Sequence, residues 1–302
     1  MSVKRFLDII SPGRPAFLNA SWIQGIPLRS VFMIAAIWHA CQGRQRRPLR
    51  ILEVGSWMGS SCLTWAEALR LFNGGQGEVV CVDPLVPYFD ADEMKAALAN
   101  PDAAVQRSQE ELLGEMDALL HEDFVYDILM HNVSTVPPPT TVTVIREFSD
   151  KALAALPDSS FDFVYLDGSH FYDHVVQDIR HAKRLVKDGG FICGDDLELE
   201  IHQIDLGFAV ANKAKDFPTD PRTGTQFHPG VTLAVGEMFG VVANYFGFWL
   251  VERKATSFAP VPFQHQFPIG LPSHFPPAMC EMVMGQLRQL GLLKEHGGAW
   301  KG

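Results

Sequence analysis

The chain has 302 residues, of which 47% are hydrophobic, and its mean hydropathy is +0.04. A chain of this length and composition can bury a full core, either as one large α/β domain with additions or as two small domains. The formal net charge of −10 argues against general binding to nucleic acids or to anionic membranes.

The sequence gives no sign of export or of a membrane anchor. Met1–Pro12 lack the long apolar run and the small-residue cleavage site of a signal peptide, and no apolar stretch reaches membrane-spanning length. The five cysteines are scattered without C-x-x-C spacing, which favours reduced thiols. We therefore expect a soluble, cytoplasmic protein.

Residues 1–48 predict a helical extension in front of the main domain. A short leading helix is followed by a stretch that proline and glycine interrupt, and then by a helix over Leu28–Cys41. This second helix has one apolar stripe, which is typical of a helix that packs on a sheet. The stripe consists of Val31, Ile34, Ala35 and Trp38.

The stretch E-V-G-S-W-M-G-S-S, from Glu53 to Ser61, combines the end of a strand, a glycine turn and the start of a helix over Cys62–Leu71. Glycine lets the backbone approach a ligand closely, and the free N–H groups of a helix start favour a negative group. The spacing matches neither a dinucleotide loop nor a P-loop. It suits the methionyl part of S-adenosylmethionine, with Glu53 near the amine. The alternative is an ordinary turn of an α/β protein.

A second acid follows the next buried strand. Glu78–Val82 leads to Asp83, whose carboxylate can accept hydrogen bonds from both hydroxyls of a ribose. Asp-Pro also begins ordinary turns, but next to the glycine loop the ribose interpretation is the better one.

Residues 85–140 are expected to form a helical insertion. The helices expected in it are Glu93–Ala99, Gln109–His121 and Asp123–Val133. A β-branched strand over Thr140–Ile145 follows. Phe148 could then flank a flat ring such as adenine, and Ser149 could cap the next helix.

Two further strands also end in acids. Phe161–Leu166 leads to Asp167, and Phe191–Cys193 leads to an acidic pair, with an amphipathic helix over Tyr172–Lys187 between them. This alternation predicts a parallel sheet with helices on both faces, in which ligands bind beyond the carboxyl ends of the strands. The acids at such ends are Glu53, Asp83, Asp167, Asp195 and Asp196.

The last third of the chain carries fewer signals. Helices are expected over Asp205–Phe217, from Pro229 to Phe239 and over Ala278–Leu293, and Val241–Val251 is fit for one or two final strands. Residues 255–277 are rich in Pro, Phe and His without periodicity, so they would form an ordered wrap, a lid or an oligomer contact.

Taken together, these motifs resemble the class I S-adenosylmethionine-dependent methyltransferases, and among them the small-molecule O-methyltransferases of the macrocin and catechol types. The resemblance covers about residues 48–252 and rests on E-V-G-S-W-M-G-S-S, V-D-P, F-D-F-V-Y-L-D-G-S-H, D-G-G-F-I-C-G-D-D and H-P-G-V-T-L-A-V-G-E-M-F-G. It implies a Rossmann-like, doubly wound, mostly parallel seven-stranded sheet. We expect an extension over 1–48, a methyltransferase domain over 49–252 and a C-terminal extension over 253–302.

The resemblance also implies a set of site residues. The cofactor would be held by Glu53, Gly55, Ser56, Gly59, Ser61, Asp83, Phe148, Ser149 and Asp167. In metal-dependent members of the family the corresponding acids bind magnesium, which would carry over to Asp167, Asp195 and Asp196. The chemistry agrees, because three neighbouring carboxylates repel one another unless a hard divalent cation stabilises them.

Such a cation would lower the pKa of a bound hydroxyl and align it behind the methyl group. His170, three residues after Asp167, is the candidate general base, and both residues are predicted to be catalytic. Macrocin-type enzymes often have an acid where this chain has Ser169, so the base stays open. His228 either faces the pocket or only precedes a helix.

Three functions remain open. The first is metal-assisted O-methylation of a small acceptor such as a sugar, natural product or phenol. The second is metal-independent O- or N-methylation with His170 as the base. The third is a non-catalytic cofactor-binding protein, against which the retained acids argue. We expect a small-molecule acceptor and no nucleic-acid or membrane partner, and the oligomeric state stays open.

Overall fold

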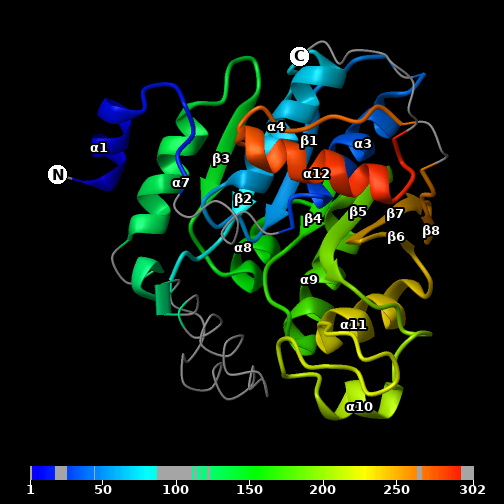
Figure 1. The fold of residues 1–302 in the computed structure, drawn as a ribbon. Coiled ribbons are helices and arrows are strands. Elements are labelled where there is room, and N and C mark those ends of the chain that lie inside the picture. The colour runs from blue at the N-terminus through cyan, green and yellow to red at the C-terminus, as the bar shows by residue number, and fades with distance from the viewer. Residues whose placement is uncertain are drawn as a thin grey trace.

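The computed structural model describes residues 2–17, 26–43, 45–86, 111, 114–115, 117–120, 123–263 and 267–293. Within them, a central sheet lies between helices (Figure 1). Its strands are β1 Leu49–Val54, β2 Gly77–Val82, β3 Thr141–Ile145, β4 Phe161–Leu166, β5 Val186–Leu197, β6 Ala243–Tyr245, β7 Gly247–Lys254 and β8 Ser257–Pro260.

The strand order is β3-β2-β1-β4-β5-β7-β6, and β8 pairs with β7 off this path. Strands β1 to β5 pair in parallel, β7 runs antiparallel to β5, and β6 and β8 run antiparallel to β7. The predicted Rossmann-like, mostly parallel sheet is therefore confirmed. The predicted number of seven strands is wrong, because the described residues include an eighth strand, in which Ser257–Pro260 folds back on β7.

The helices agree with the predicted ones except at some ends. They are α1 Val3–Ile10, α3 Arg29–Cys41, α4 Ser60–Asn73, α7 Phe124–Ser134, α8 Ser149–Ala155, α9 Tyr172–Leu185, α10 Leu206–Ala211, α11 Pro229–Phe239 and α12 Pro277–Gln289. The predicted helix Glu93–Ala99 lies outside the described residues. Of the predicted helix 109–121, residues 111, 114–115 and 117–120 are described and are helical.

Two details of the helix ends correct the prediction. The helix expected over Asp205–Phe217 ends early, at Ala211, because Asn212 leaves the helical conformation, with φ −117° and ψ 18°, and its side chain donates to the carbonyl of Phe208. Helix α8 begins at Ser149 itself, so this serine lies inside the helix and Phe148 occupies the N-cap position.

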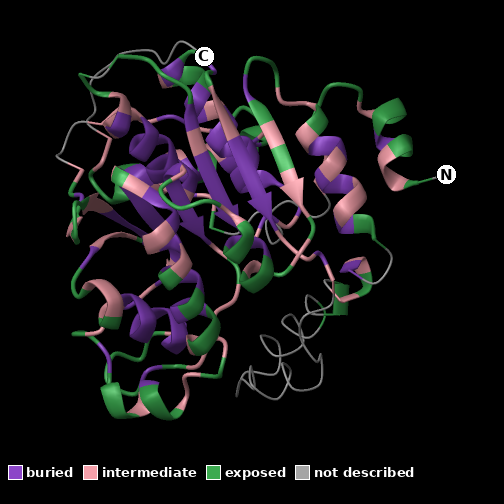
Figure 2. Cartoon of the chain, turned by 180° about the vertical axis from the view of Figure 1, so that it is seen from behind, coloured by how far each residue is buried: buried purple, intermediate pink, exposed green. Residues whose placement is uncertain are grey.

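Each face of the sheet is covered by its own group of helices (Figures 1 and 2). Ile51, at the centre of β1, packs in the core formed with α3, α4 and α12. The next residue, Leu52, points to the opposite face and packs in the core formed with α8, α9 and α11. Helix α12 thus belongs to the main core, although it lies in the predicted C-terminal extension.

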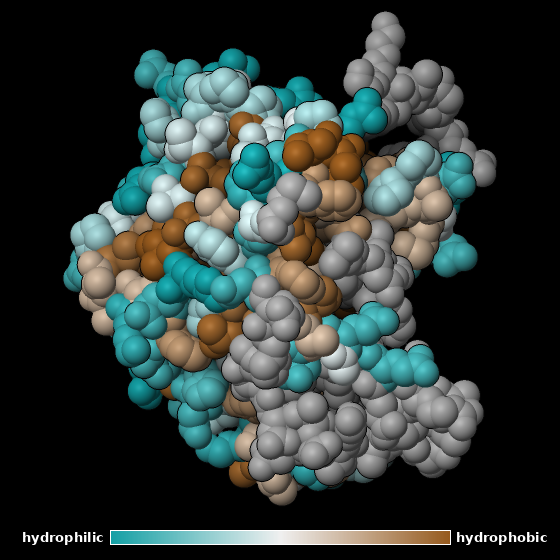
Figure 3. Space-filling view, turned by 90° about the vertical axis from the view of Figure 1, so that its left-hand side faces the viewer, coloured by the Kyte–Doolittle hydropathy of each residue, from teal (hydrophilic) through white to brown (hydrophobic). Residues whose placement is uncertain are grey.

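Helix α1 lies beside α7, away from the sheet centre, and packs on it through a smaller apolar cluster. On this side of the molecule, Figure 3 shows brown apolar patches among hydrophilic side chains. The exposed large apolar residues of α1 are Phe6, Ile9 and Ile10. Among the described residues, no helix combines the length and apolarity that crossing a bilayer requires.

The register of the parallel strands aligns their carboxyl ends. Val54, the last residue of β1, pairs with Val82 of β2 and with Leu166 of β4. Leu166 pairs in turn with Gly194 of β5. The residues that follow these strand ends therefore meet at one edge of the sheet, which is where the fold places ligands.

Candidate functional site

The glycine loop after β1 lies directly against the end of β4. Gly55 has φ 83°, and a Cβ atom on it would lie 2.0 Å from the backbone oxygen of Asp167, so only glycine fits there. Gly59, with φ 89°, is the N-cap residue of α4. The loop therefore presents bare backbone and the start of a helix at the sheet edge, which favours a negatively charged ligand group.

Glu53 is a fully buried carboxylate at this edge. It has no exposed surface, and neither of its oxygens has a hydrogen-bond partner. Burial raises the pKa of Glu53 to about 7, against a smaller opposing effect of the nearby Ser56 and Ser61 hydroxyls. A buried carboxylate without a partner destabilises the folded chain unless a cation or a hydrogen-bond donor binds to it.

Asp83, at the end of β2, holds the glycine loop. One oxygen of its carboxylate accepts from the backbone N–H groups of Ser56 at 2.8 Å and Trp57 at 2.9 Å. The other oxygen accepts from the N–H of Leu85 at 2.8 Å. Asp83 thus fixes the loop on β2. The lone pairs that these bonds leave free could accept hydrogen bonds from the hydroxyls of a ribose.

Arg29, at the start of α3, lies among the acids predicted to bind magnesium. Its Nη1 atom forms an ion pair with Asp195 and lies 3.1 Å from Oδ2 of Asp167. The hydroxyl of Tyr165 also donates to Asp167, at 3.1 Å. Burial would lower the pKa of Arg29, but the charges of Asp167, Tyr165 and Asp195 outweigh burial and raise it, so the guanidinium stays charged.

The predicted magnesium position does not fit this arrangement. Ligand oxygens of Asp167, Asp195 and Asp196 lie within 4.8 Å of one another. Arg29 already supplies positive charge to Asp167 and Asp195, however, and Asp196 pairs with a histidine instead. Nη1 of Arg29 lies between two of the three carboxylates that a hard cation would need.

His170 lies between two carboxylates. Its Nε2 is 3.1 Å from Oδ2 of Asp196, and its Nδ1 is 2.5 Å from Oδ1 of Asp216. Burial would lower the pKa of His170, but the charges of Asp196 and Asp216 outweigh it and raise the pKa well above the usual value. Burial likewise would raise the pKa of Asp196, but His170 and then His228 lower it.

His228, the N-cap residue of α11, stacks beside His170 with ring centroids 4.2 Å apart. Its Nδ1 lies 3.0 Å from Glu198 Oε1 and 4.0 Å from Asp196 Oδ1. Two imidazoles and three carboxylates thus form one network at the ends of β4 and β5.

The backbone of β5 is irregular where it supplies this network. The pairing of β5 with β7 shifts between Gly194 and Leu197, and Asp196 between them has φ 61°. A β-bulge changes the direction in which side chains point, and aspartate tolerates the left-handed backbone conformation better than most residues. A pocket opens here, lined on its polar side by Asp167, Ser169, His170, Asp195 and Asp196.

Comparison with known proteins identifies the kind of domain to which residues 52–197 correspond. Residues 52–197 match the family described as "Methyltransferase domain". The chain contains a methyltransferase domain. The match spans the glycine loop, Asp83, Asp167 and the acidic pair, so the resemblance to class I methyltransferases seen in the sequence is confirmed.

No curated protein matches the chain. Similar solved structures include CalS11, a TDP-rhamnose 3'-O-methyltransferase of calicheamicin biosynthesis, at 14% identity over 82% of this chain and 91% of that chain, TM-score 0.38. An O-methyltransferase from Bacillus cereus in complex with SAH is 14% identical over 83% of this chain and 97% of that chain, TM-score 0.41. The O-methyltransferase NovP is 13% identical over 75% and 80%, TM-score 0.46. Likenesses this distant carry no argument about the acceptor.

Within the methyltransferase domain, the predicted site residues fall into two groups. Glu53, Gly55, Ser56, Gly59, Ser61 and Asp83 gather around the loop after β1, and Asp167, His170, Asp195 and Asp196 gather at the ends of β4 and β5. Phe148 is 48% exposed, and the hydroxyl of Ser149 lies near Asp178, whose pKa it lowers against the larger effect of burial. Their adenine contacts stay predictions.

Three residues of the site were missed by the sequence analysis: Arg29, Glu198 and Asp216. Arg29 lies in a helix that the domain match does not include, and Asp216 follows α10 in an irregular segment. Glu198 is the residue that follows β5, two positions after Asp196, and this strand-end placement was the one available signal for it.

Proposed function

We propose that the chain transfers the methyl group of S-adenosylmethionine to a hydroxyl oxygen of a small molecule. The observation that carries the proposal is the orphaned carboxylate of Glu53, buried beside a glycine loop that belongs to a methyltransferase domain. The cationic amine of the methionyl group is the partner that this acid lacks. The N–H groups at the start of α4 suit the carboxylate of the same group.

The ribose of the cofactor is assigned to Asp83, whose position at the end of β2 supports this role. Gly55, Ser56, Gly59 and Ser61 would surround the methionyl part. Phe148 and Ser149 are proposed to lie near the adenine. Asp167, which follows β4, would face the region between cofactor and acceptor.

The acidic pocket supports oxygen as the atom that is methylated. A hydroxyl must lose its proton as its oxygen attacks the methyl carbon and the carbon–sulfur bond breaks. The unit of His170, Asp196 and Asp216 contains two carboxylates for one imidazolium, and this net negative charge attracts the proton that the hydroxyl releases. An amine acceptor attacks through its neutral lone pair and has less need of such a unit.

Magnesium on Asp167, Asp195 and Asp196 is not part of this proposal, because Arg29 neutralises two of the three acids. Arg29 instead supplies fixed positive charge next to the acceptor pocket. A preorganised cation of this kind can stabilise negative charge that develops on the acceptor oxygen.

The test is methyl transfer from cofactor carrying a labelled methyl group to matched acceptors that differ only in having a hydroxyl or an amine. Mass spectrometry of the products identifies the methylated atom. We expect label on oxygen and slower transfer in Asp216→Asn, which removes part of this negative charge. Label on nitrogen would overturn the choice of acceptor atom but leave the cofactor assignment intact.

A further inference from the structure

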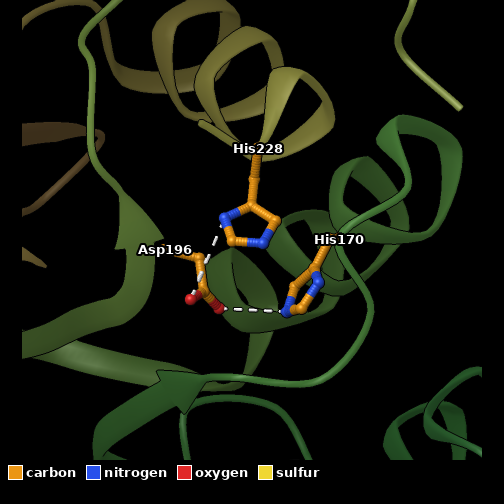
Figure 4. A group of neighbouring side chains, drawn as sticks. All are labelled: His170, Asp196 and His228. Carbon is orange, nitrogen blue, oxygen red and sulfur yellow. Dashed lines mark ion pairs between the residues drawn. The ribbon is translucent and has the colours of Figure 1, made fainter. Parts of the chain in front are cut away.

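Three elements bring His170, Asp196 and His228 to one point (Figure 4). His170 follows β4, Asp196 lies in β5, and His228 precedes α11. One nitrogen of each imidazole and one oxygen of Asp196 all lie within 4.8 Å of one another. This group differs from the three-carboxylate set, because two of its three donors are imidazole nitrogens.

Two atoms that both offer lone pairs attract each other only through a cation between them. Nε2 of His170 and Oδ2 of Asp196 are 3.1 Å apart, so either a proton or a metal ion must join them. Ligands bound about 2.0–2.2 Å from a metal lie roughly 3 Å from one another. The observed spacing therefore suits a shared metal ion as well as a shared proton.

A second carboxylate contacts each imidazole. Asp216 lies 2.5 Å from Nδ1 of His170, and Glu198 lies 3.0 Å from Nδ1 of His228. Metal-binding histidines commonly donate one N–H to a carboxylate, which fixes the tautomer and orients the other nitrogen toward the metal. His170 has this arrangement, whereas Nδ1 of His228 faces both Glu198 and Asp196, at 3.0 and 4.0 Å.

The backbone also holds the group together. Gly230, in the first turn of α11, packs so closely on the loop after β4 that a Cβ atom would lie 2.2 Å from the carbonyl oxygen of His170. This contact fixes His228 relative to His170. The ring of Phe217 stacks on His228 with centroids 4.6 Å apart. Asp196 reaches the group from its left-handed backbone position.

We propose that His170, Asp196 and His228 form a binding site for a divalent transition-metal ion such as Zn²⁺, Co²⁺ or Fe²⁺. Two imidazoles and one carboxylate are a donor set that these ions prefer over Mg²⁺. Asp216 and Glu198 orient the two histidines from outside. Positions left open on the ion would face the polar pocket. The ion would take the place of the proton shared by His170 and Asp196, and its binding is measured without the methyl-transfer assay.

The proposal is tested with the full chain, freed of any histidine tag, and with Co²⁺ and Zn²⁺ as probes. Visible absorption of the cobalt form reports nitrogen coordination, and calorimetry with Zn²⁺ gives affinity and stoichiometry. The variants are His228→Ala and Glu198→Gln. His202→Ala is the matched control, because the side chain of His202 is 57% exposed and pairs with Glu200, at 3.8 Å, outside the proposed site.

We expect one ion per chain, unchanged in His202→Ala and bound at least about tenfold more weakly in His228→Ala and Glu198→Gln. Mg²⁺ should not displace it. If the unaltered chain shows neither visible absorption bands with Co²⁺ nor a heat of Zn²⁺ binding, the proposal is overturned. The cluster would then be an ion-pair network joined by protons. Binding that His228→Ala leaves unchanged would overturn it as well. If His228→Ala does not fold, Glu198→Gln decides in the same way.

Discussion

Arg29 and Asp195, separated by 166 residues, form a buried ion pair at the carboxyl edge of the sheet. The side chain of Arg29 is 11% exposed and that of Asp195 is 1% exposed. This pair ties α3, which precedes the matched domain, to the acidic pair at the end of β5. The positive charge that sequence analysis assigned to magnesium is thus present in the chain itself.

Replacing Arg29 with alanine should destabilise the chain and create a magnesium site. Breaking a buried ion pair costs about 3–5 kcal/mol, because the remaining carboxylates lose their counter-charge. With Arg29 gone, Asp167 and Asp195 regain the repulsion that a hard cation relieves. Urea unfolding measures the loss, and calorimetry should detect Mg²⁺ binding to Arg29→Ala only.

Arg29→Lys is the matched control for this prediction. It retains a positive charge, so we expect it to lose less stability and to bind no Mg²⁺. Tight Mg²⁺ binding by the unaltered chain would contradict the interpretation of Arg29 as the resident cation.

Glu53→Gln should stabilise the cofactor-free chain at alkaline pH. The pKa of Glu53 is about 7 in the folded chain against an ordinary 4.5, so folding favours its protonated form. Stability is therefore unaffected by this group below pH 4.5, falls between pH 4.5 and 7, and is lower by about 3 kcal/mol above pH 7. Glutamine removes this loss. Thermal unfolding from pH 4 to 9 measures it.

The same substitution should weaken cofactor binding, because it removes the negative charge that would meet the amine. For the same reason, the affinity of the unaltered chain should rise as Glu53 ionises near pH 7. Glu281→Gln, on the exposed side of α12, is the control and should change neither property. A Glu53→Gln chain that binds S-adenosylhomocysteine normally at pH 8 would rule out this acid as the amine site.

Asp83→Ala should loosen the glycine loop and also weaken the binding of the cofactor. The backbone N–H groups of Ser56 and Trp57 would lose their shared acceptor, at about 1–3 kcal/mol for each donor that stays buried. We expect at least a tenfold loss in affinity for S-adenosylhomocysteine by calorimetry. Asp173→Ala, whose side chain is 81% exposed, should bind normally. Equal affinities for both variants would contradict the assigned role.

Gly230→Ala should separate α11 from the loop that carries His170. The added methyl would lie 2.2 Å from a backbone oxygen, so the helix must move, and His228 moves with it. We expect a loss of about 1–3 kcal/mol in unfolding free energy from overpacking and weaker Zn²⁺ binding. Gly285→Ala in α12 has open space around it and should be neutral or stabilising. Unchanged Zn²⁺ affinity in Gly230→Ala would argue against the packing role.

The sequence predicted the strand ends well, because short apolar strands that end in an acid are local patterns. Glu53, Asp83, Asp167 and Asp195 all occur where such patterns place them, at one edge of the sheet. The eighth strand was not predicted, since Ser257–Pro260 pairs only through the hairpin that follows β7.

The partners of these acids could not be predicted in the same way. Arg29 reaches Asp195 only after α3 packs on the sheet, and no local pattern encodes that contact. In the metal-independent alternative His170 acts alone as the base, but the fold brings Asp216 to its second nitrogen. The left-handed conformation of Asp196 depends on the bulge between β5 and β7, a pairing between distant segments.

The most direct test of the central claim is calorimetric titration of S-adenosylhomocysteine into the tag-free chain, with NAD⁺ titrated in parallel. We predict micromolar or tighter binding of S-adenosylhomocysteine, none of NAD⁺, and weaker binding in Glu53→Gln and Asp83→Ala. Absence of S-adenosylhomocysteine binding by a chain that unfolds cooperatively would contradict the claim that this sheet edge holds the methyl donor.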